Sequence, residues 1–232
     1  AQGTPEELLV RTHQTSLEAA YIALLPDDRK KDHREITIPP LSKSIDTEIA
    51  IEAKDLTLRF GDFIAVDHVN FKIQKGEIFG FIGSNGCGKS TTMKMLTGNL
   101  APSAGSVKIC GIDMIENPKE AKALIGYLPE TPPLYRELTV DEFLTVTARL
   151  HGISSKAIKS AVDRAKQRCG LTEMSKRLIE NLSKGYQQRV GIAQAIIHNP
   201  MVVILDEPTV GLDPIQIRDI RTLIKELGKE HS

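Results

Sequence analysis

Residues 83–91, GSNGCGKST, carry the clearest chemistry in this sequence. They satisfy the pattern G-x-x-x-x-G-K-[ST], which predicts a loop that binds the phosphates of a nucleotide. Glycines let the backbone turn and point its N–H groups at a phosphate without a Cβ in the way. Lys89 carries the charge that reaches the β- and γ-phosphates, and Ser90 supplies an oxygen for Mg²⁺. The alternative is a chance glycine-rich turn. Such a turn would need glycines but not the lysine and the serine that follow them here.

Every position of this loop is a candidate nucleotide contact. The set is Gly83, Ser84, Asn85, Gly86, Cys87, Gly88, Lys89, Ser90 and Thr91. We expect Thr91 to hold the α-phosphate, and we expect a helix that begins near Lys89 to direct its positive end at the same anion. Cys87 could be a reactive thiol, but a small residue tolerated at a variable position is the interpretation that we favour.

Two acidic residues end a short apolar segment later in the chain. Residues 202–207, VVILDE, begin with four apolar positions in a row, which is typical of a strand buried on both faces of a parallel sheet. Asp206 would then lie at the carboxyl end of a strand, where open α/β sheets bind ligands. We expect Asp206 to hold Mg²⁺ and Glu207 to act as general base on the attacking water. A turn that only caps the strand is the alternative.

A third motif, LSKG at residues 182–185, precedes a predicted helix. Ser183 is a suitable N-cap, and its hydroxyl and the N–H groups that follow could bind an anion. Taken alone, this motif indicates only a helix cap. Its place between the other two motifs gives it more weight.

The elements that must position these residues are predicted from hydrophobic periodicity. Alternation predicts strands over 48–60 and 63–73, joined by a turn at Gly61 and Asp62, and a short apolar strand over 77–83 leads into the loop. Helices are predicted at 88–98, 118–125, 140–153, 155–170, 184–199 and 215–230. This order predicts an α/β fold with a parallel central sheet and a helical insertion at about 134–182.

Composition limits the class of protein without indicating its chemistry. Thirty Lys+Arg balance thirty Asp+Glu, so the formal net charge is zero, which argues against bulk electrostatic binding of nucleic acid. Apolar residues make up 41% of the chain, and no apolar run approaches the ~18–20 residues of a membrane span. Three scattered cysteines predict neither a disulfide frame nor a zinc site, and they indicate a reducing, cytosolic compartment.

Residues 1–47 differ from the rest of the chain in hydrophobic spacing, charge and proline content. Helical spacing predicts a short helix over 16–25, with Ser16 as N-cap and Pro26 after its end. A charged stretch and the two prolines at 39–40 then indicate a linker. We place the boundary near residue 47, and a disordered extension over 1–47 is the alternative.

The motifs GSNGCGKST, LSKGYQQR and VVILDEPTVGLD together resemble the ATP-binding domain of ABC transporters over about residues 48–232. The resemblance implies a P-loop NTPase fold of ABC type, with a mainly parallel core sheet, an antiparallel β subdomain and a helical insertion. It implies ATP and Mg²⁺ as ligands, and a head-to-tail dimer in which the signature of one subunit contacts the ATP held by the other. The signature positions are Leu182, Ser183, Lys184 and Gly185, and the dimer loop is Gly211, Leu212 and Asp213.

The resemblance also implies roles for two residues outside the motifs. Phe60 matches the aromatic residue that stacks on adenine, with a core aromatic at a strand end as the alternative. Glu130, in IGYLPE, stands where relatives have a glutamine that binds Mg²⁺ and water. A carboxylate can also bind Mg²⁺, but it adds charge near Asp206 and Glu207, so we expect a different Mg²⁺ dependence.

Two further departures concern the signature and the C-terminal region. Lys184 and Tyr186 replace the commonest glycine and glutamine of the signature, which we do not interpret as inactivation. Relatives carry a switch histidine on a strand after the last helix, and neither His198 nor His231 lies in that motif. We therefore expect the C-terminal strands of the domain to be missing from this chain, and we expect it to bind ATP but hydrolyse it poorly.

The first functional hypothesis is an ATP-binding subunit that powers a membrane transporter, an exporter of the ABC-2 type. Its partners would be a transmembrane permease domain and a second ATP-binding domain, and its place the cytoplasmic face of the inner membrane. The alternative is a soluble ribosome-associated ATPase acting in translation, because residues 1–47 resemble the junction of a tandem ABC protein of that type. We expect no direct nucleic-acid contact, since the sequence has no basic run beyond Arg29, Lys30 and Lys31.

Overall fold

The computed structural model describes residues 4–13, 23–24 and 48–228 of the chain. The N-terminal part contains a short helix α1, Pro5–Thr12. The helix predicted over 16–25 and the linker prolines lie almost entirely outside the described residues. In the described part of the chain, no helix is long and apolar enough to cross a membrane.

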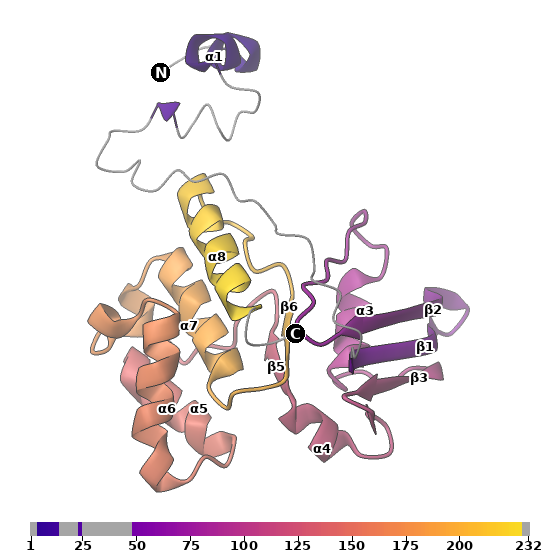
Figure 1. Ribbon diagram of the computed structural model, residues 1–232. Coiled ribbons are helices and arrows are strands. Elements are labelled where there is room, and N and C mark those ends of the chain that lie inside the picture. The colour runs from indigo at the N-terminus through magenta and orange to yellow at the C-terminus, as the bar shows by residue number, and fades with distance from the viewer. Residues whose placement is uncertain (1–3, 14–22, 25–47, 229–232) are drawn as a thin grey trace.

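A four-stranded antiparallel sheet forms one side of the molecule (Figure 1). Strand β1, Ile49–Phe60, pairs with β2, Phe63–Gln74, across the two-residue turn, so the predicted hairpin is confirmed. Gly61 has a φ of 59°, a left-handed conformation that glycine adopts without strain. Two strands that the sequence analysis did not predict, β3 (Ala104–Ile109) and β4 (Ile112–Asp113), complete the order β2-β1-β3-β4.

A second sheet consists of two parallel strands, β5 (Ile125–Leu128) and β6 (Val202–Leu205), in register from Ile125 opposite Val202 to Leu128 opposite Leu205. The buried strand β6 was predicted, but β5 was not. Its first residue had been assigned to a helix over 118–125, whereas α4 is only Pro118–Ala123. The structure thus confirms the α/β class, and the parallel part of its core comprises two strands in the described residues.

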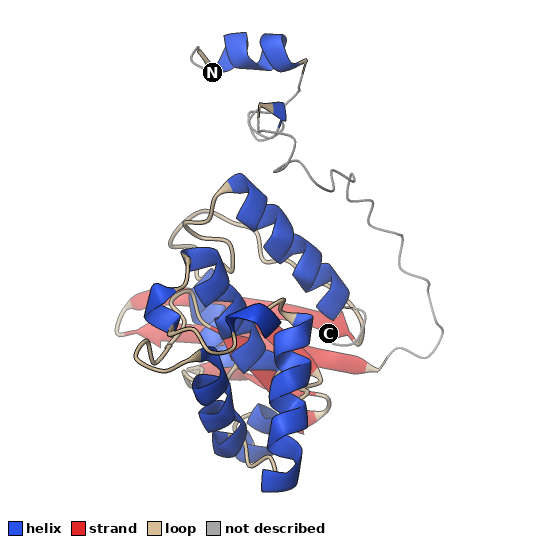
Figure 2. Cartoon of the chain, turned by 90° about the vertical axis from the view of Figure 1, so that its left-hand side faces the viewer, coloured by secondary structure: helices blue, strands red, loops and turns tan. Residues whose placement is uncertain are grey.

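Helices lie on both sides of the parallel strands. Helix α3, Lys89–Leu96, follows the phosphate-binding loop and lies beside the antiparallel sheet. Helices α5 (Val140–Leu150), α6 (Ser155–Arg168), α7 (Lys184–Ile196) and α8 (Pro214–Leu227) gather on the other side of β5 and β6. Single turns of 3₁₀ helix at Thr172–Met174 and Ile179–Asn181 connect α6 to α7. Figure 2 shows this helical layer in front of the strands.

Two hydrophobic clusters hold these layers together. One joins the antiparallel sheet, α3 and the parallel strands through Leu56, Met95, Val107 and Val202. The other lies among α5–α8 and includes Leu144, Ile192 and Ile220, each at most 1% exposed. Leu128 at the end of β5 belongs to this second cluster. Both clusters therefore meet at the parallel strands, which carry the residues predicted to do chemistry.

The strand predicted over 77–83 does not form, so this prediction was wrong. In this segment Phe79 and Phe81 both lie near the ring of Phe71, at 5.9 and 5.3 Å between ring centroids. Within the described residues no strand pairs with it, and a strand assignment requires such hydrogen bonds. The residues of this segment are apolar, as in a buried strand. Their sequence does not show whether a neighbouring strand is present to form hydrogen bonds with them.

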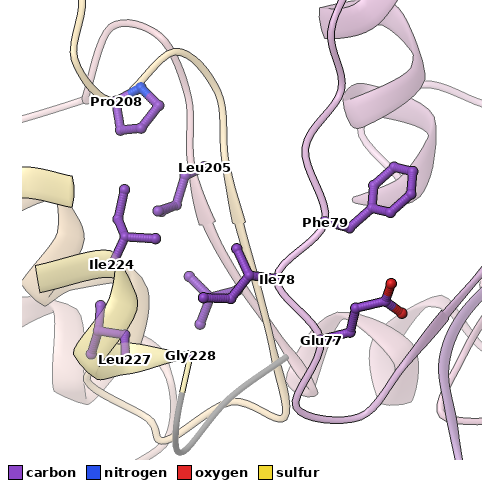
Figure 3. A pocket seen from close by; sticks show the side chains of 9 residues that line it. Glu77, Ile78, Phe79, Leu205, Pro208, Ile224, Leu227 and Gly228 are labelled. Atoms are coloured by element: carbon purple, nitrogen blue, oxygen red, sulfur yellow. The ribbon is translucent and has the colours of Figure 1, made fainter. Parts of the chain in front are cut away.

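A groove of about 210 Å³ lies beside this extended segment, against β6 and α8. Figure 3 shows Ile78 directed toward Ile224 and Leu227 of α8, whereas Glu77 and Phe79 point away from that helix. Ile78 remains 57% exposed despite this contact. The segment that leads into the glycine-rich loop therefore has no strand partner in the described residues, and Ile78, Phe79 and Ile82 remain exposed.

Gly126 of β5 tests the packing of α7 on the parallel strands. An added Cβ would overlap the Ala195 carbonyl oxygen and lie 3.0 Å from its carbon, and backbone atoms cannot move aside as a side chain can. We expect Gly126→Ala to lower the free energy of unfolding by about 1–3 kcal/mol, measured by urea denaturation.

The matched control is Gly80→Ala, because an added Cβ there would meet nothing within 4 Å. We expect this variant to lie within about 0.5 kcal/mol of the parent chain. Equal stabilities of the two variants would contradict the close approach of α7 to β5.

Candidate active site

The loop of residues 83–88 leads directly into α3 without a side-chain cap. Gly86 and Gly88 have φ values of 83° and 91°, which a residue with a Cβ rarely adopts. A Cβ on Gly88 would also lie 2.6 Å from the Ala65 carbonyl oxygen of β2. Glycine is thus required at position 88 by conformation and by space, and the first N–H groups of α3 remain available for an anion.

Lys89 folds back over the loop that precedes it. Its Nζ donates hydrogen bonds to the carbonyl oxygens of Gly83 and Ser84, both at 2.9 Å. A phosphate on the loop would lie beside the same ammonium group and accept hydrogen bonds from it. The Lys89 ammonium group thus lies against the backbone of the loop that precedes it.

Asp206 and Ser90 meet at the carboxyl end of the parallel strands. The Ser90 hydroxyl donates to Asp206 Oδ1 at 3.2 Å, and the Asp206 N–H donates to the Leu128 carbonyl oxygen at 2.9 Å. Asp206 is only 3% exposed. Burial, and then the nearby Asp206 carboxylate, raise the pKa of Tyr127 on β5. The two oxygen donors predicted for Mg²⁺ are thus adjacent, although they are far apart in the sequence.

The donor set suits a hard divalent cation. In the described part of the chain there is no group of three or more His, Cys, Asp or Glu side chains that could hold a metal ion. Mg²⁺ typically takes one or two protein oxygens and completes its shell with substrate phosphates and water. Ser90 and Asp206 therefore fit a Mg²⁺ ion that arrives with a nucleotide.

Glu207 follows Asp206 in an unusual backbone conformation. Its φ of 47° lies in the left-handed region, which costs a non-glycine residue of order 1–3 kcal/mol and is found most often at functional sites. The residue is exposed, in contrast to buried Asp206. The turn therefore separates the two carboxylates, one held in the protein and one presented to solvent.

Glu130 lies at the same edge of the parallel sheet. It is exposed and follows Leu128, whose register partner Leu205 precedes Glu207 by the same two positions. Both glutamates therefore lie two residues past the ends of neighbouring parallel strands. This placement agrees with a role for Glu130 beside Asp206 and Glu207.

The predicted signature residues form the start of α7. Ser183 is its N-cap, and the Ser183 hydroxyl accepts a hydrogen bond from the Tyr186 N–H at 3.4 Å. Within the described residues, no hydrogen bond joins the signature to the phosphate-binding loop. The signature instead lies against the predicted dimer loop, where Asp213 caps α8 by accepting from the Ile215 and Gln216 N–H groups at 3.0 Å.

Phe60 is the last residue of β1 and is 56% exposed, so it is not a core aromatic. Phe63 lies opposite it across the turn and is 66% exposed. Phe63 is not among the predicted site residues, although a second aromatic residue directly after a two-residue turn is visible in the sequence. Two exposed rings thus flank the tip of the hairpin.

Comparisons with known proteins agree with these motifs. The family model described as ABC transporter matches residues 66–210. The bacitracin transport ATP-binding protein BcrA of Bacillus licheniformis is 42% identical over 182 residues, covering 78% of this chain and 58% of the relative. The probable multidrug ABC transporter ATP-binding protein YbhF of Escherichia coli is 36% identical over 221 residues, covering 94% of this chain and 38% of the relative.

Solved structures give the same result. CbiO1 of Clostridium perfringens, part of the ABC transporter complex CbiONQ, superposes with a TM-score of 0.72 at 29% identity. The superposition covers 79% of this chain and 75% of that structure. The chain spans between about two fifths and three fifths of the length of the two curated relatives above.

Cys87 offers a chemical test of the loop. It is exposed, whereas Cys110 is half-buried and Cys169 is fully buried. Burial raises the pKa of Cys110, and it raises the pKa of Cys169 to about 12, so neither favours the reactive thiolate. We expect a maleimide to label Cys87 selectively and ATP to slow that labelling, as measured by mass spectrometry.

Cys87→Ser is the control and should leave the chain almost unlabelled. Full ATP binding by a completely labelled chain would place the nucleotide elsewhere.

Proposed function

Because the chain belongs to the ABC transporter family, we propose that it binds ATP with Mg²⁺ and hydrolyses it to power a membrane transporter, an exporter of the ABC-2 type. The observation that carries the proposal is the hydrogen bond of 3.2 Å between Asp206 and Ser90, the residue after Lys89, whose ammonium group lies on the preceding loop. A nucleotide phosphate, a cation and a buried carboxylate can be brought together at this point. Few other functions require that combination.

Each residue has a distinct part in the proposed reaction. The loop N–H groups and Lys89 would hold the phosphates, while the exposed ring of Phe60 would stack on the base. Ser90 and Asp206, with Glu130 nearby, would hold Mg²⁺, which when bound neutralises charge on the β- and γ-phosphates. Glu207 would accept a proton from the attacking water, since its side chain is presented to solvent.

We propose a second ATP-binding domain as partner, in a head-to-tail arrangement. The signature at the start of α7 contacts no part of its own phosphate-binding loop through hydrogen bonds in the described residues. Its capping serine and the N-terminal N–H groups of α7 would therefore serve an anion held by another subunit.

We also propose a transmembrane permease as partner, which places the chain at the cytoplasmic face of the inner membrane. Residues 134–182 would form the helical subdomain that contacts it, and Tyr135 there is 50% exposed and packs edge-on against Phe143. The relatives named above are ATP-binding proteins of transporters, which favours transport over the ribosome-associated alternative.

Two substitutions separate ATP binding from hydrolysis. Lys89→Ala should raise the Kd for ATP at least about 30-fold, because it removes a cation that contacts phosphate in a partly desolvated site. Glu207→Gln should retain ATP binding while lowering the rate constant of hydrolysis about 100-fold or more. Equilibrium fluorescence with a labelled ATP analogue and a phosphate-release assay measure the two quantities.

Glu226→Gln, an exposed glutamate of α8, is the control and should change neither quantity. ATP binding that survives Lys89→Ala unchanged would argue against the phosphate-binding loop as the site.

Glu130→Gln tests the predicted third ligand. Loss of one partly screened charge should raise the Mg²⁺ concentration needed for half-maximal ATP binding about threefold. Glu137→Gln, also exposed and nearby in sequence, is the matched control. A Mg²⁺ titration that is the same for both variants would exclude Glu130 as a ligand.

A further inference from the structure

The signature turn and the dimer loop interlock within a single subunit, through two glycines. An added Cβ on Gly211 would lie 3.0 Å from Cε and 3.6 Å from Cδ of Lys184, and nearer still to Nζ. The outer half of the Lys184 side chain therefore lies directly over the Gly211 backbone. Gly211 has a φ of 69°, so the loop turns sharply beneath the ammonium group.

The second contact runs in the opposite direction. An added Cβ on Gly185 would lie 2.9 Å from Cδ and 3.2 Å from Oε1 of Gln216. The Gln216 amide thus covers the backbone of α7 one residue after Lys184. Gly185 itself is buried, although it lies in the first turn of the helix.

A helix cap closes these contacts into a ring. Asp213 lies two positions after Gly211 and accepts hydrogen bonds from the Ile215 and Gln216 N–H groups. That cap fixes the first turn of α8, which carries Gln216 and places it next to Gly185. Further along the two helices, Arg189 of α7 forms an ion pair with Asp219 of α8 at 3.3 Å.

Lys184 is an unusual residue for its position in a helix. A cation in the first turn lies near the positive end of the helix dipole, which is unfavourable. Lys184 is exposed, and within the described residues it has no carboxylate partner that would offset this cost. Its packing on Gly211 is the contact that the structure provides for it.

From this ring of contacts we propose that Lys184 and Gln216 are positioning residues that lock the signature turn to the dimer loop. The inference rests on the proposed function, since it assigns these two elements a common motion when ATP joins two subunits. A signature that moves toward the nucleotide of the partner then carries the loop after Glu207 with it. ATP bound by one subunit thereby sets the position of the catalytic segment in the other.

Amide hydrogen exchange in the chain without nucleotide tests the lock directly. The reporters are the Val210 and Leu212 N–H groups, which donate to the Glu207 and Thr209 carbonyl oxygens at 3.2 and 3.3 Å. Lys184→Gly should speed their exchange about fivefold or more, and Lys184→Arg should restore it in part. Lys156→Met, an exposed lysine in the first turn of α6, is the matched control and should leave these amides unchanged.

A double-mutant cycle tests the second contact. Gly185→Ala should speed exchange of the same amides because its Cβ displaces Gln216. In a chain that already carries Gln216→Ala, adding Gly185→Ala should change the exchange rate little. Effects that simply add would overturn the proposal, as would unchanged exchange in Lys184→Gly.

The functional consequence is measured by ATP-dependent dimer formation in a Glu207→Gln background, by analytical ultracentrifugation. We expect Lys184→Gly to weaken this dimer about tenfold and Lys184→Arg to recover part of it. A dimer of unchanged affinity, with faster exchange in the loop, would overturn the positioning role. A parent chain that does not bind ATP would instead contradict the proposed function. The exchange rates would still show whether Lys184 holds the signature turn against the dimer loop.

Discussion

The buried carboxylate of Asp206 is the group on which the arrangement of this site depends. Its backbone N–H continues the parallel pairing of β5 and β6 by donating to Leu128, and its side chain accepts from Ser90 at the start of α3. A carboxylate that is 3% exposed is costly unless it is hydrogen-bonded. The same contacts that satisfy it therefore bring the strand end and the phosphate-binding loop together.

Close approach at glycines is the second constraint. Gly88 lies against β2, Gly126 lies against α7, and Gly185 and Gly211 receive side chains from each other's segments. In each case the absence of a Cβ allows two segments to approach more closely than the apolar contacts around them would alone permit. The positions of α3 and α7 relative to the sheets, and with them the distances between functional residues, follow from these approaches.

The motifs predicted the local backbone correctly, because their local requirements are strong. A glycine loop before a helix, and an apolar strand that ends in acid, each specify a backbone shape within a few residues, and both form at 83–96 and 202–206. The strand β5 was missed because its four residues follow a helical pattern without a break. The segment 77–83 does not form a strand, although its residues are apolar, because an apolar run cannot supply a hydrogen-bonded neighbour. The packing of Lys184 on Gly211 depends on how α7 and α8 meet, and no local pattern encodes that.

The left-handed backbone of Glu207 has a consequence for how this sequence can change. A glycine there would relieve the φ of 47° and stabilise the folded chain, while it would delete the carboxylate presented to water. With Glu207 in its proposed role as general base, selection for stability and selection for activity act in opposite directions at this position. Laboratory evolution toward heat resistance alone would be expected to replace Glu207 early, and a library screened only for folding would enrich chains without the proposed general base.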